Sequence, residues 1–212
     1  MMRTVCWYYD VTELERESRF SAALELIPWE ERRKKVLRFV HRKDQLLSLG
    51  AGLLMWQALL QAGATNLDLE FAPSGKPFLR QHPHLHFNIS HSGSLAVCAV
   101  SDAPIGVDVE YIAPIDAAVA AYCLSSDEQD YLRRASDPER TFCELWTRKE
   151  SCLKLLGCGL DAPLSQMSTL FGHPWSFAKL ELPKAMISVC TERSISVEFR
   201  PFSYFDGSTD TP

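Results

Sequence analysis

The sequence predicts an α+β fold, because helical and strand patterns occupy different parts of its 212 residues. The opening Thr4–Tyr9 is β-branched and aromatic, which is typical of a strand. Helical spacing dominates Glu13–Ala62, and strand patterns return in the last quarter of the chain. A short echo also occurs: Val97-Cys98 precedes Ile-Gly-Val-Asp-Val much as Val189-Cys190 precedes Ile-Ser-Val-Glu-Phe. Taken alone, an echo of this length is more often chance than a repeat.

Three helices are expected in the first third of the chain. Each has apolar residues at helical spacing, and the longest carries a continuous apolar face that ends at Gly63. The second is strongly basic. The expected ranges are Glu13–Ile27, Pro28–Phe39 and Asp44–Ala62.

Short strands and further helices are expected in the rest of the chain. The segment Pro73–Pro77 is turn-prone. An alanine-rich helix follows Pro114, and the next helix begins with a capping box of Ser125 and Glu128. Gly157 marks the end of the last helix. Strands are expected at 86–89, 95–100, 106–110, 175–182, 185–191 and 194–202.

The composition indicates a soluble globular protein, with 46% hydrophobic and 23% charged residues. We expect no membrane association, because no apolar run approaches the ~18 residues that span a bilayer and the start of the chain lacks a secretory apolar core. The seven cysteines contain no Cys-x-x-Cys pair, so buried free thiols in a cytoplasmic, reducing setting are expected. The net charge of −5 argues against nucleic acid as a partner.

Positive charge is concentrated in one short stretch. Between Arg32 and Lys43 the chain has seven lysines or arginines and no acidic residue. Such a local cationic field is suited to a polyanionic ligand. The seven residues are Arg32, Arg33, Lys34, Lys35, Arg38, Arg42 and Lys43.

Paired carboxylates occur in the stretch Gly106-Val-Asp-Val-Glu110. On a strand, Asp108 and Glu110 project to one side and the two valines to the other. Two adjacent carboxylates with apolar neighbours repel each other unless a cation lies between them, and a hard divalent ion such as Mg²⁺ suits them. An edge strand with a solvated acidic face explains the same five residues about equally well.

The stretch Trp146-Thr-Arg-Lys-Glu-Ser-Cys-Leu-Lys154 is expected to be helical. Glu150 and Lys154 are four residues apart and therefore neighbours on the helix surface. An ordinary surface ion pair, worth roughly 0.3–0.5 kcal/mol, is the simplest explanation of the two alone. Their occurrence with Trp146 and Lys149, downstream of the paired carboxylates, favours a functional role.

Three ordered stretches resemble the signature of the 4'-phosphopantetheinyl transferases: Phe87-Asn-Ile-Ser-His-Ser-Gly93, Gly106–Glu110 and Trp146–Lys154. The similarity runs from about residue 28 to 163 and is strongest to the larger, monomeric group typified by the surfactin-synthetase activator. The resemblance implies two similar α+β halves packed as a pseudo-dimer in one chain. Residues 1–104 would then carry the basic coenzyme-binding segment, and residues 105–212 the metal and transfer motifs.

The resemblance also implies a reaction, the transfer of the phosphopantetheine arm of coenzyme A to a serine of an apo acyl or peptidyl carrier protein, with release of adenosine 3',5'-bisphosphate. Mg²⁺ would be held by Asp108, Glu110 and Glu150. Lys154 would contact the phosphates. Glu150 would take the serine proton, directly or through a metal-bound water, and this role competes with metal ligation for one carboxylate. The expected coenzyme contacts are Lys35, Arg42, Lys76, Ser90, His91 and Lys154.

Two departures and two alternatives remain. Relatives often carry an arginine near the position of Gly52, and Cys158 occupies a place that is frequently basic. Glu128 fits both a capping role and, by resemblance, an approach to the active centre. A non-catalytic module that binds coenzyme A or a carrier protein, and a Mg²⁺-dependent phosphodiesterase, are the competing functions. The sequence does not specify the carrier.

Overall fold

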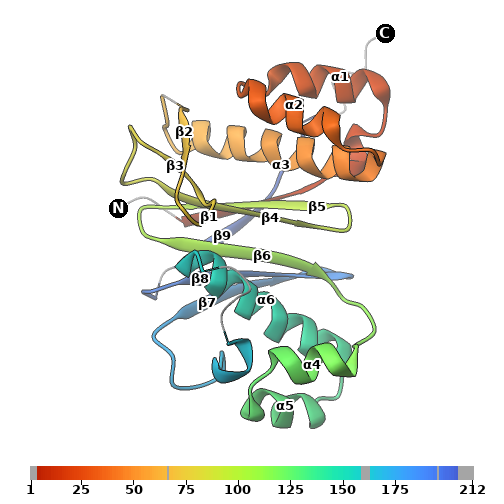
Figure 1. Ribbon diagram of the computed structural model, residues 1–212, viewed down its shortest axis with the longest axis vertical. Helices are drawn as coiled ribbons and strands as arrows, with labels where there is room; N and C mark the ends of the chain where they lie inside the picture. The colour runs from red at the N-terminus through yellow and green to blue at the C-terminus, as the bar shows by residue number, and fades with distance from the viewer. Residues whose placement is uncertain (1–3, 66, 159–162, 195, 205–212) are drawn as a thin grey trace.

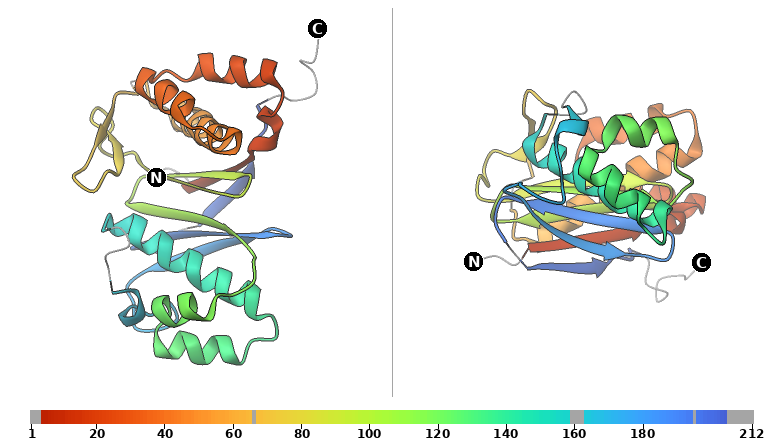
Figure 2. Two further views of the ribbon diagram at one scale, coloured as in Figure 1. Left: turned by 45° about the vertical axis from the view of Figure 1, so that its right-hand side comes forward. Right: turned by 90° about the horizontal axis from the view of Figure 1, so that it is seen from below.

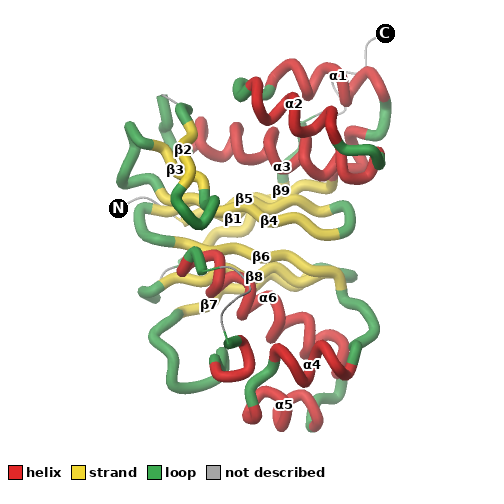
Figure 3. Tube along the Cα trace, viewed as in Figure 1, coloured by secondary structure: helices red, strands yellow, loops and turns green. Residues whose placement is uncertain are grey.

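The computed structural model describes residues 4–65, 67–158, 163–194 and 196–204. Two β-sheets lie face to face in the middle of the molecule, and helices cover the outer face of each (Figures 1 and 3). The turned views show the same layers, with one group of helices at each end (Figure 2). The predicted α+β class, with two similar halves, is confirmed.

The first sheet has four strands in the order β4-β5-β1-β9. They span His86–Ser92, Leu95–Ser101, Thr4–Asp10 and Val197–Pro201 respectively. β1 is antiparallel to β5 and parallel to β9. The last described strand of the chain therefore completes the sheet that the first strand begins.

Three helices cover this sheet: α1 (Glu17–Leu26), α2 (Glu30–Arg38) and α3 (Arg42–Gln61). The single helix expected from residue 13 is instead a 3-10 turn, η1 (Val11–Leu14), followed by α1. The side chain of Asp10 accepts a hydrogen bond from the backbone N–H of Thr12, which starts that turn separately. α3 is buried along most of its length and forms the main contact with β5.

A small two-stranded hairpin, β2 (Leu69–Phe71) and β3 (Pro77–Leu79), projects beside α3. The turn between its strands contains Gly75 at φ +81°, a conformation that glycine adopts without strain. This is the turn predicted from the Pro-Ser-Gly-Lys-Pro sequence.

The second sheet has three antiparallel strands in the order β6-β8-β7. They span Ile105–Tyr111, Ala185–Thr191 and Ser176–Glu181. Apolar side chains from both sheets share one core cluster, with Val97 and Ala99 on the first sheet facing Val107 and Val189 on the second. This shared core holds the two halves together. Ile195, which belonged to the predicted echo, lies outside the described residues.

The outer face of the second sheet is covered by α6 (Pro138–Leu156), with α4 (Ala117–Cys123), α5 (Ser126–Arg133) and the 3-10 turn η3 (Leu164–Gln166) packed outside it. α6 approaches β6 very closely. A Cβ atom on Gly106 would lie 1.9 Å from the carbonyl oxygen of Ser151, so only glycine fits there.

The predicted helix signals are confirmed in this half. Glu128 completes the capping box with Ser125 at the start of α5. Gly157 ends α6 at φ 70°. All seven cysteines are free, but Cys158 is exposed, so the expectation of uniform burial is wrong at that position. Within the described ranges, the search for helices long and apolar enough to cross a bilayer found none.

Candidate active site

Three elements bring polar side chains to one place between the halves: β4 with Ser90, β6 with Asp108 and Glu110, and α6 with Glu150 and Lys154. The period of a strand explains the geometry of β6. Val107 and Val109 are fully buried in the core between the sheets, so the two carboxylates face the other way, toward α6 and β4. The predicted alternation along this strand is therefore correct.

Asp108, Ser90 and Lys154 form a closed hydrogen-bonded triangle. Oδ1 of Asp108 accepts from Lys154 Nζ at 2.6 Å and from Ser90 Oγ at 2.8 Å. Lys154 Nζ also donates to Ser90 Oγ at 2.7 Å. Asp108 is only 2% exposed, whereas 28% of the Lys154 side chain reaches solvent. The carboxylate is thus buried behind a lysine that stays accessible to a ligand.

Glu110 and Glu150 complete a concentration of negative charge around this triangle. Oε2 of Glu110 accepts from Ser92 Oγ at 2.7 Å. Burial raises the pKa of Glu110, and Asp108 adds to the increase. Burial also raises the pKa of Glu150, with further increases from Asp108 and Glu110. The three carboxylates therefore oppose one another's ionisation.

Two carboxylate oxygens in the site lack a partner. Asp108 Oδ2 and Glu150 Oε1 are buried, and neither has a hydrogen-bond partner among the described residues. The described residues also contain no group of three or more His, Cys, Asp or Glu side chains already gathered at ligating distances. The donors are nevertheless all carboxylate oxygens, which suit a hard cation such as Mg²⁺, and two of them have no hydrogen-bond donor among the described residues.

The residues of the basic segment line different cavities. Arg32 and Lys35, on α2, line a 450 Å³ cavity together with Trp29 and Pro77. Burial lowers the pKa of His91, and Lys154, Arg32 and Lys35 lower it further. His91 therefore lies within the electrostatic reach of the cations from both sides of the site.

Arg32 is a candidate that the sequence analysis did not single out. Its guanidinium lies across α3, where Nη2 donates to the carbonyl of Ser48 at 3.1 Å and Nε is buried without a partner in the described structure. A Cβ atom on Gly52 would lie 2.5 Å from that Nε. Gly52, whose missing side chain leaves space over α3, thus makes room for an arginine from α2. A glycine in the interior of a predicted helix was the available signal.

Arg42 lies in a different place from Lys35. Its Nη2 donates to Glu17 Oε2 at 2.9 Å, and its Cζ lies 3.7 Å from the centre of the Phe20 ring. It lines a separate 720 Å³ cavity with Tyr111. The assignment of Arg42 to a coenzyme phosphate stays a prediction.

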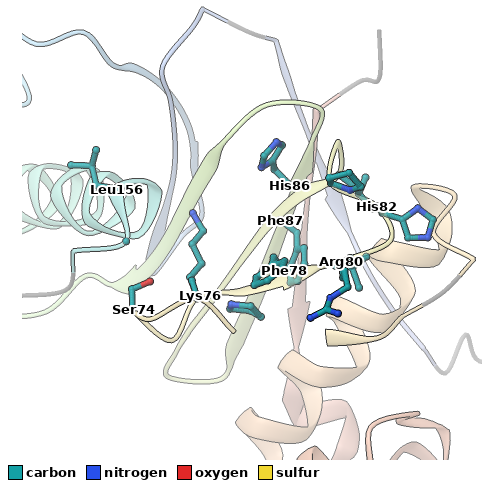
Figure 4. A pocket seen from close by; sticks show the side chains of 14 residues that line it. Ser74, Lys76, Phe78, Arg80, His82, His86, Phe87 and Leu156 are labelled. Carbon is teal, nitrogen blue, oxygen red and sulfur yellow. The ribbon is translucent and has the colours of Figure 1, made fainter. Parts of the chain in front are cut away.

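Lys76 lies between two cavities. A 290 Å³ cavity on one side is lined by Lys76, Pro77, Asn88, Glu150 and Lys154, among others. A 470 Å³ pocket on the other side is mostly apolar, and Figure 4 shows Lys76 in it with Leu156 on one flank and His86 on the other. Pro77 lines both the cavity next to Lys154 and the cavity next to Arg32 and Lys35, so the two cavities are neighbours.

Glu128 and Lys149 lie apart from this site as a fully buried ion pair, with Nζ and Oε2 2.7 Å apart. Lys149 Nζ also donates to the carbonyls of Leu164 and Met167. The backbone N–H and the hydroxyl of Thr169 both donate to Glu128 Oε1 at 2.8 Å. The structure thus gives Glu128 a capping and pairing role inside the second half.

Comparisons with known proteins agree with this architecture. A family model described as the 4'-phosphopantetheinyl transferase superfamily matches residues 104–199, and one described as 4'-phosphopantetheinyl transferase, N-terminal, matches residues 15–103. A 4'-phosphopantetheinyl transferase of Bacillus subtilis is 35% identical over 175 residues, which cover 79% of this chain and 75% of the relative. The transferase psf-1 of Bacillus pumilus is 45% identical over 112 residues, 52% of this chain and about half (48%) of the relative.

The molecule has two stacked α+β halves, with three carboxylates and a lysine where they meet. This arrangement is consistent with an enzyme that transfers a phosphate-linked group. The two family models and the B. subtilis relative make the assignment specific. The chain belongs to the 4'-phosphopantetheinyl transferase superfamily.

Proposed function

We propose that this protein transfers the 4'-phosphopantetheine arm of coenzyme A to a serine hydroxyl of an apo carrier protein. The observation that supports this most is the Ser90–Asp108–Lys154 triangle, flanked by Glu110 and Glu150 and connected through Pro77 to the cationic Arg32 cavity. Coenzyme A carries phosphate at two separated points, its pyrophosphate and its ribose 3'-phosphate. Lys154 is proposed to meet the first of these, and Arg32 and Lys35, which line the neighbouring cavity, the second.

The residues proposed to hold a divalent cation are Asp108, Glu110 and Glu150. The unpaired oxygens of Asp108 and Glu150 support this choice. Bound Mg²⁺ would neutralise negative charge on the pyrophosphate oxygens near the attacked phosphorus.

Lys154 is proposed to bind the pyrophosphate. Its ammonium is oriented by Asp108 and Ser90 and remains partly exposed, so a phosphate oxygen can reach it. A donor that is already oriented stabilises the leaving phosphate without reorganising. Ser90 and His91 would add a hydroxyl and an imidazole, while Arg32 and Lys35 would bind the 3'-phosphate.

Glu150 is proposed as the acceptor of the serine proton. Without a cation, burial and two neighbouring carboxylates raise the pKa of Glu150, whereas a cation held by the same carboxylate would lower it, so the two roles compete for one side chain. In the step, the serine oxygen forms a bond to the β-phosphorus of coenzyme A and the bond from that phosphorus to the bridging oxygen breaks. The proton passes to Glu150, and adenosine 3',5'-bisphosphate leaves.

The same proposal includes the domain boundary, the location, the oligomeric state and the partner. We place the junction of the two halves between residues 104 and 105, and we expect a cytoplasmic monomer that acts on a carrier protein rather than on nucleic acid or membranes. The Arg42 contact with coenzyme A stays a prediction from the resemblance.

The test is incubation with coenzyme A and Mg²⁺, with and without a panel of apo acyl and peptidyl carriers, followed by mass spectrometry. A carrier that gains the mass of the phosphopantetheine arm is the expected result. Breakdown of coenzyme A without a carrier would instead indicate a phosphodiesterase. Binding of coenzyme A without turnover on any carrier would indicate a non-catalytic module.

A further inference from the structure

The side chain of Lys76 joins the hairpin of the first half to two elements of the second. Its Nζ donates to the carbonyl oxygens of Ile105 at 3.0 Å, Lys154 at 2.7 Å and Leu155 at 3.2 Å. An ammonium group has three hydrogens, and these contacts use all of them. Figure 4 shows the side chain extending from the hairpin turn beside the end of α6.

The acceptors explain why a lysine is needed at this point. Lys154 and Leu155 are in the last turn of α6, where carbonyls have no partner within the helix. A cation there also complements the negative end of the helix dipole. Ile105 starts β6, three residues before Asp108. One ammonium therefore connects the two backbone segments that carry Asp108 and Lys154.

The same contacts leave Lys76 poorly placed to bind phosphate. To turn toward an anion, its ammonium would have to abandon three carbonyl oxygens, and each one left buried without a donor is costly. Burial also lowers the pKa of Lys76. The hydroxyl oxygen of Ser74, in the same turn, would lie 3.2 Å from a Cβ atom on Gly157, so this turn reaches the end of α6 at a second point.

We propose that Lys76 is a positioning residue, which fixes the end of α6 relative to β6 so that Lys154 and Asp108 keep their alignment. The inference rests on the proposed transfer reaction for its kinetic consequence. Small displacements of a catalytic group reduce rate strongly, about a hundredfold for roughly 1 Å. Loss of Lys76 should therefore impair turnover more than coenzyme binding.

The experiment compares Lys76→Met, which keeps the aliphatic stem, with Lys35→Met, which removes a proposed phosphate contact. Lys34→Met is the matched control, because Lys34 forms an exposed pair with Glu30 and Glu31. Three quantities are measured for each variant: kcat with an apo carrier, the Kd of coenzyme A by calorimetry, and hydrogen exchange of the amides in the last turn of α6.

Lys76→Met should lower kcat at least about tenfold and change the Kd of coenzyme A less than about threefold. Exchange in the last turn of α6 should rise at least about tenfold as local opening becomes easier. Lys35→Met should do the reverse: the affinity for coenzyme A should fall more than kcat. Lys34→Met should match the wild type in all three.

A Kd at least about tenfold weaker in Lys76→Met, with kcat retained at saturating coenzyme A, would overturn the proposal and make Lys76 a phosphate contact. Unchanged exchange in a folded variant would overturn it as well. If the wild-type protein transfers nothing to any carrier, the proposed function fails, and the exchange measurement alone decides whether Lys76 holds α6. Lys76→Arg, which keeps a positive charge and N–H donors at this position, is measured in the same way as a second variant.

Discussion

Helix α6 carries two lysines that each pair with a carboxylate from another element, and the pairs differ in how completely they are satisfied. Lys149 and Glu128 are both fully buried, and both oxygens of Glu128 accept hydrogen bonds. Lys154 reaches solvent, and Asp108 keeps one buried oxygen without a partner in the described structure. A complete network holds the fold, whereas an incomplete one leaves capacity for a ligand.

The largest effect is expected from breaking the complete pair. Lys149→Met leaves Glu128 as an uncompensated buried charge, which typically destabilises by about 3–5 kcal/mol. Urea unfolding of the variant and the wild type measures the difference. A loss below about 1 kcal/mol, the range of exposed pairs, would mean that the buried pair is no more important than a surface one.

Breaking the incomplete pair should affect catalysis instead. Lys154→Met should lower kcat at least about a hundredfold, as expected for removal of a group that stabilises developing charge. Its unfolding free energy should fall by only about 1–2 kcal/mol, because the Lys154 side chain is 28% exposed and water already reaches this pair. Carrier turnover and urea unfolding are the measurements.

The control for this prediction is Lys179→Met, since Lys179 Nζ lies 2.6 Å from Glu144 Oε2 in an exposed pair. It should leave both turnover and stability nearly as in the wild type. If Lys154→Met turned over as fast as this control, Lys154 and Asp108 would be an ordinary ion pair.

Added Mg²⁺ should stabilise the protein through Asp108 and Glu150, the carboxylates with an unpaired oxygen. At a concentration about 100 times its Kd, Mg²⁺ should stabilise the wild type by about 2.7 kcal/mol. Chelator should remove both this gain and the activity, and Asp108→Asn and Glu150→Gln should abolish the gain. Thermal unfolding with and without Mg²⁺ provides the readout. Full wild-type activity in excess chelator would contradict the metal assignment.

The smallest effect is expected where Arg32 crosses Gly52. A Cβ atom in Gly52→Ala displaces the guanidinium, and loss of a charge-assisted hydrogen bond of roughly 1.5–3 kcal/mol should weaken coenzyme A binding by at least about tenfold. Binding of 3'-dephospho-coenzyme A should change much less. Calorimetry with both ligands tests this, and Arg38→Gln, which removes an equal charge from the same segment, should change the affinity of neither by more than about twofold.

Sequence reasoning was most successful where the chemistry is local. The alternation of Val107, Asp108, Val109 and Glu110 follows from the two-residue period of a strand, so their placement could be predicted. The capping box of Ser125 and Glu128 lies within four consecutive residues, so it could be predicted equally well. The end of α6 at Gly157 followed from its stop signal.

Long-range partners could not be predicted in the same way. The Lys149 that pairs with Glu128 belongs to another helix, and the carbonyls that bind Lys76 lie 29, 78 and 79 residues away in the chain. A run of seven cations shows where charge is abundant but not which side chains face a cavity. Which side chains face the cavity depends on how α2 is rotated about its axis where it lies over α3. Gly52 permits the observed rotation, because a side chain there would collide with Arg32.

The pairing of β9 with β1 has a consequence for how the protein is made. On the ribosome, β1 emerges before the other described strands, and its parallel neighbour Val197–Pro201 emerges after all of them. The other three strands of the sheet are complete at Ser101, and β9 ends 100 residues later at Pro201. At about 5–20 residues per second, the edge of β1 therefore stays open for about 5–20 s. An open edge can add strands from other chains during that interval. Nascent chains truncated before β9 should therefore aggregate more readily than the finished protein.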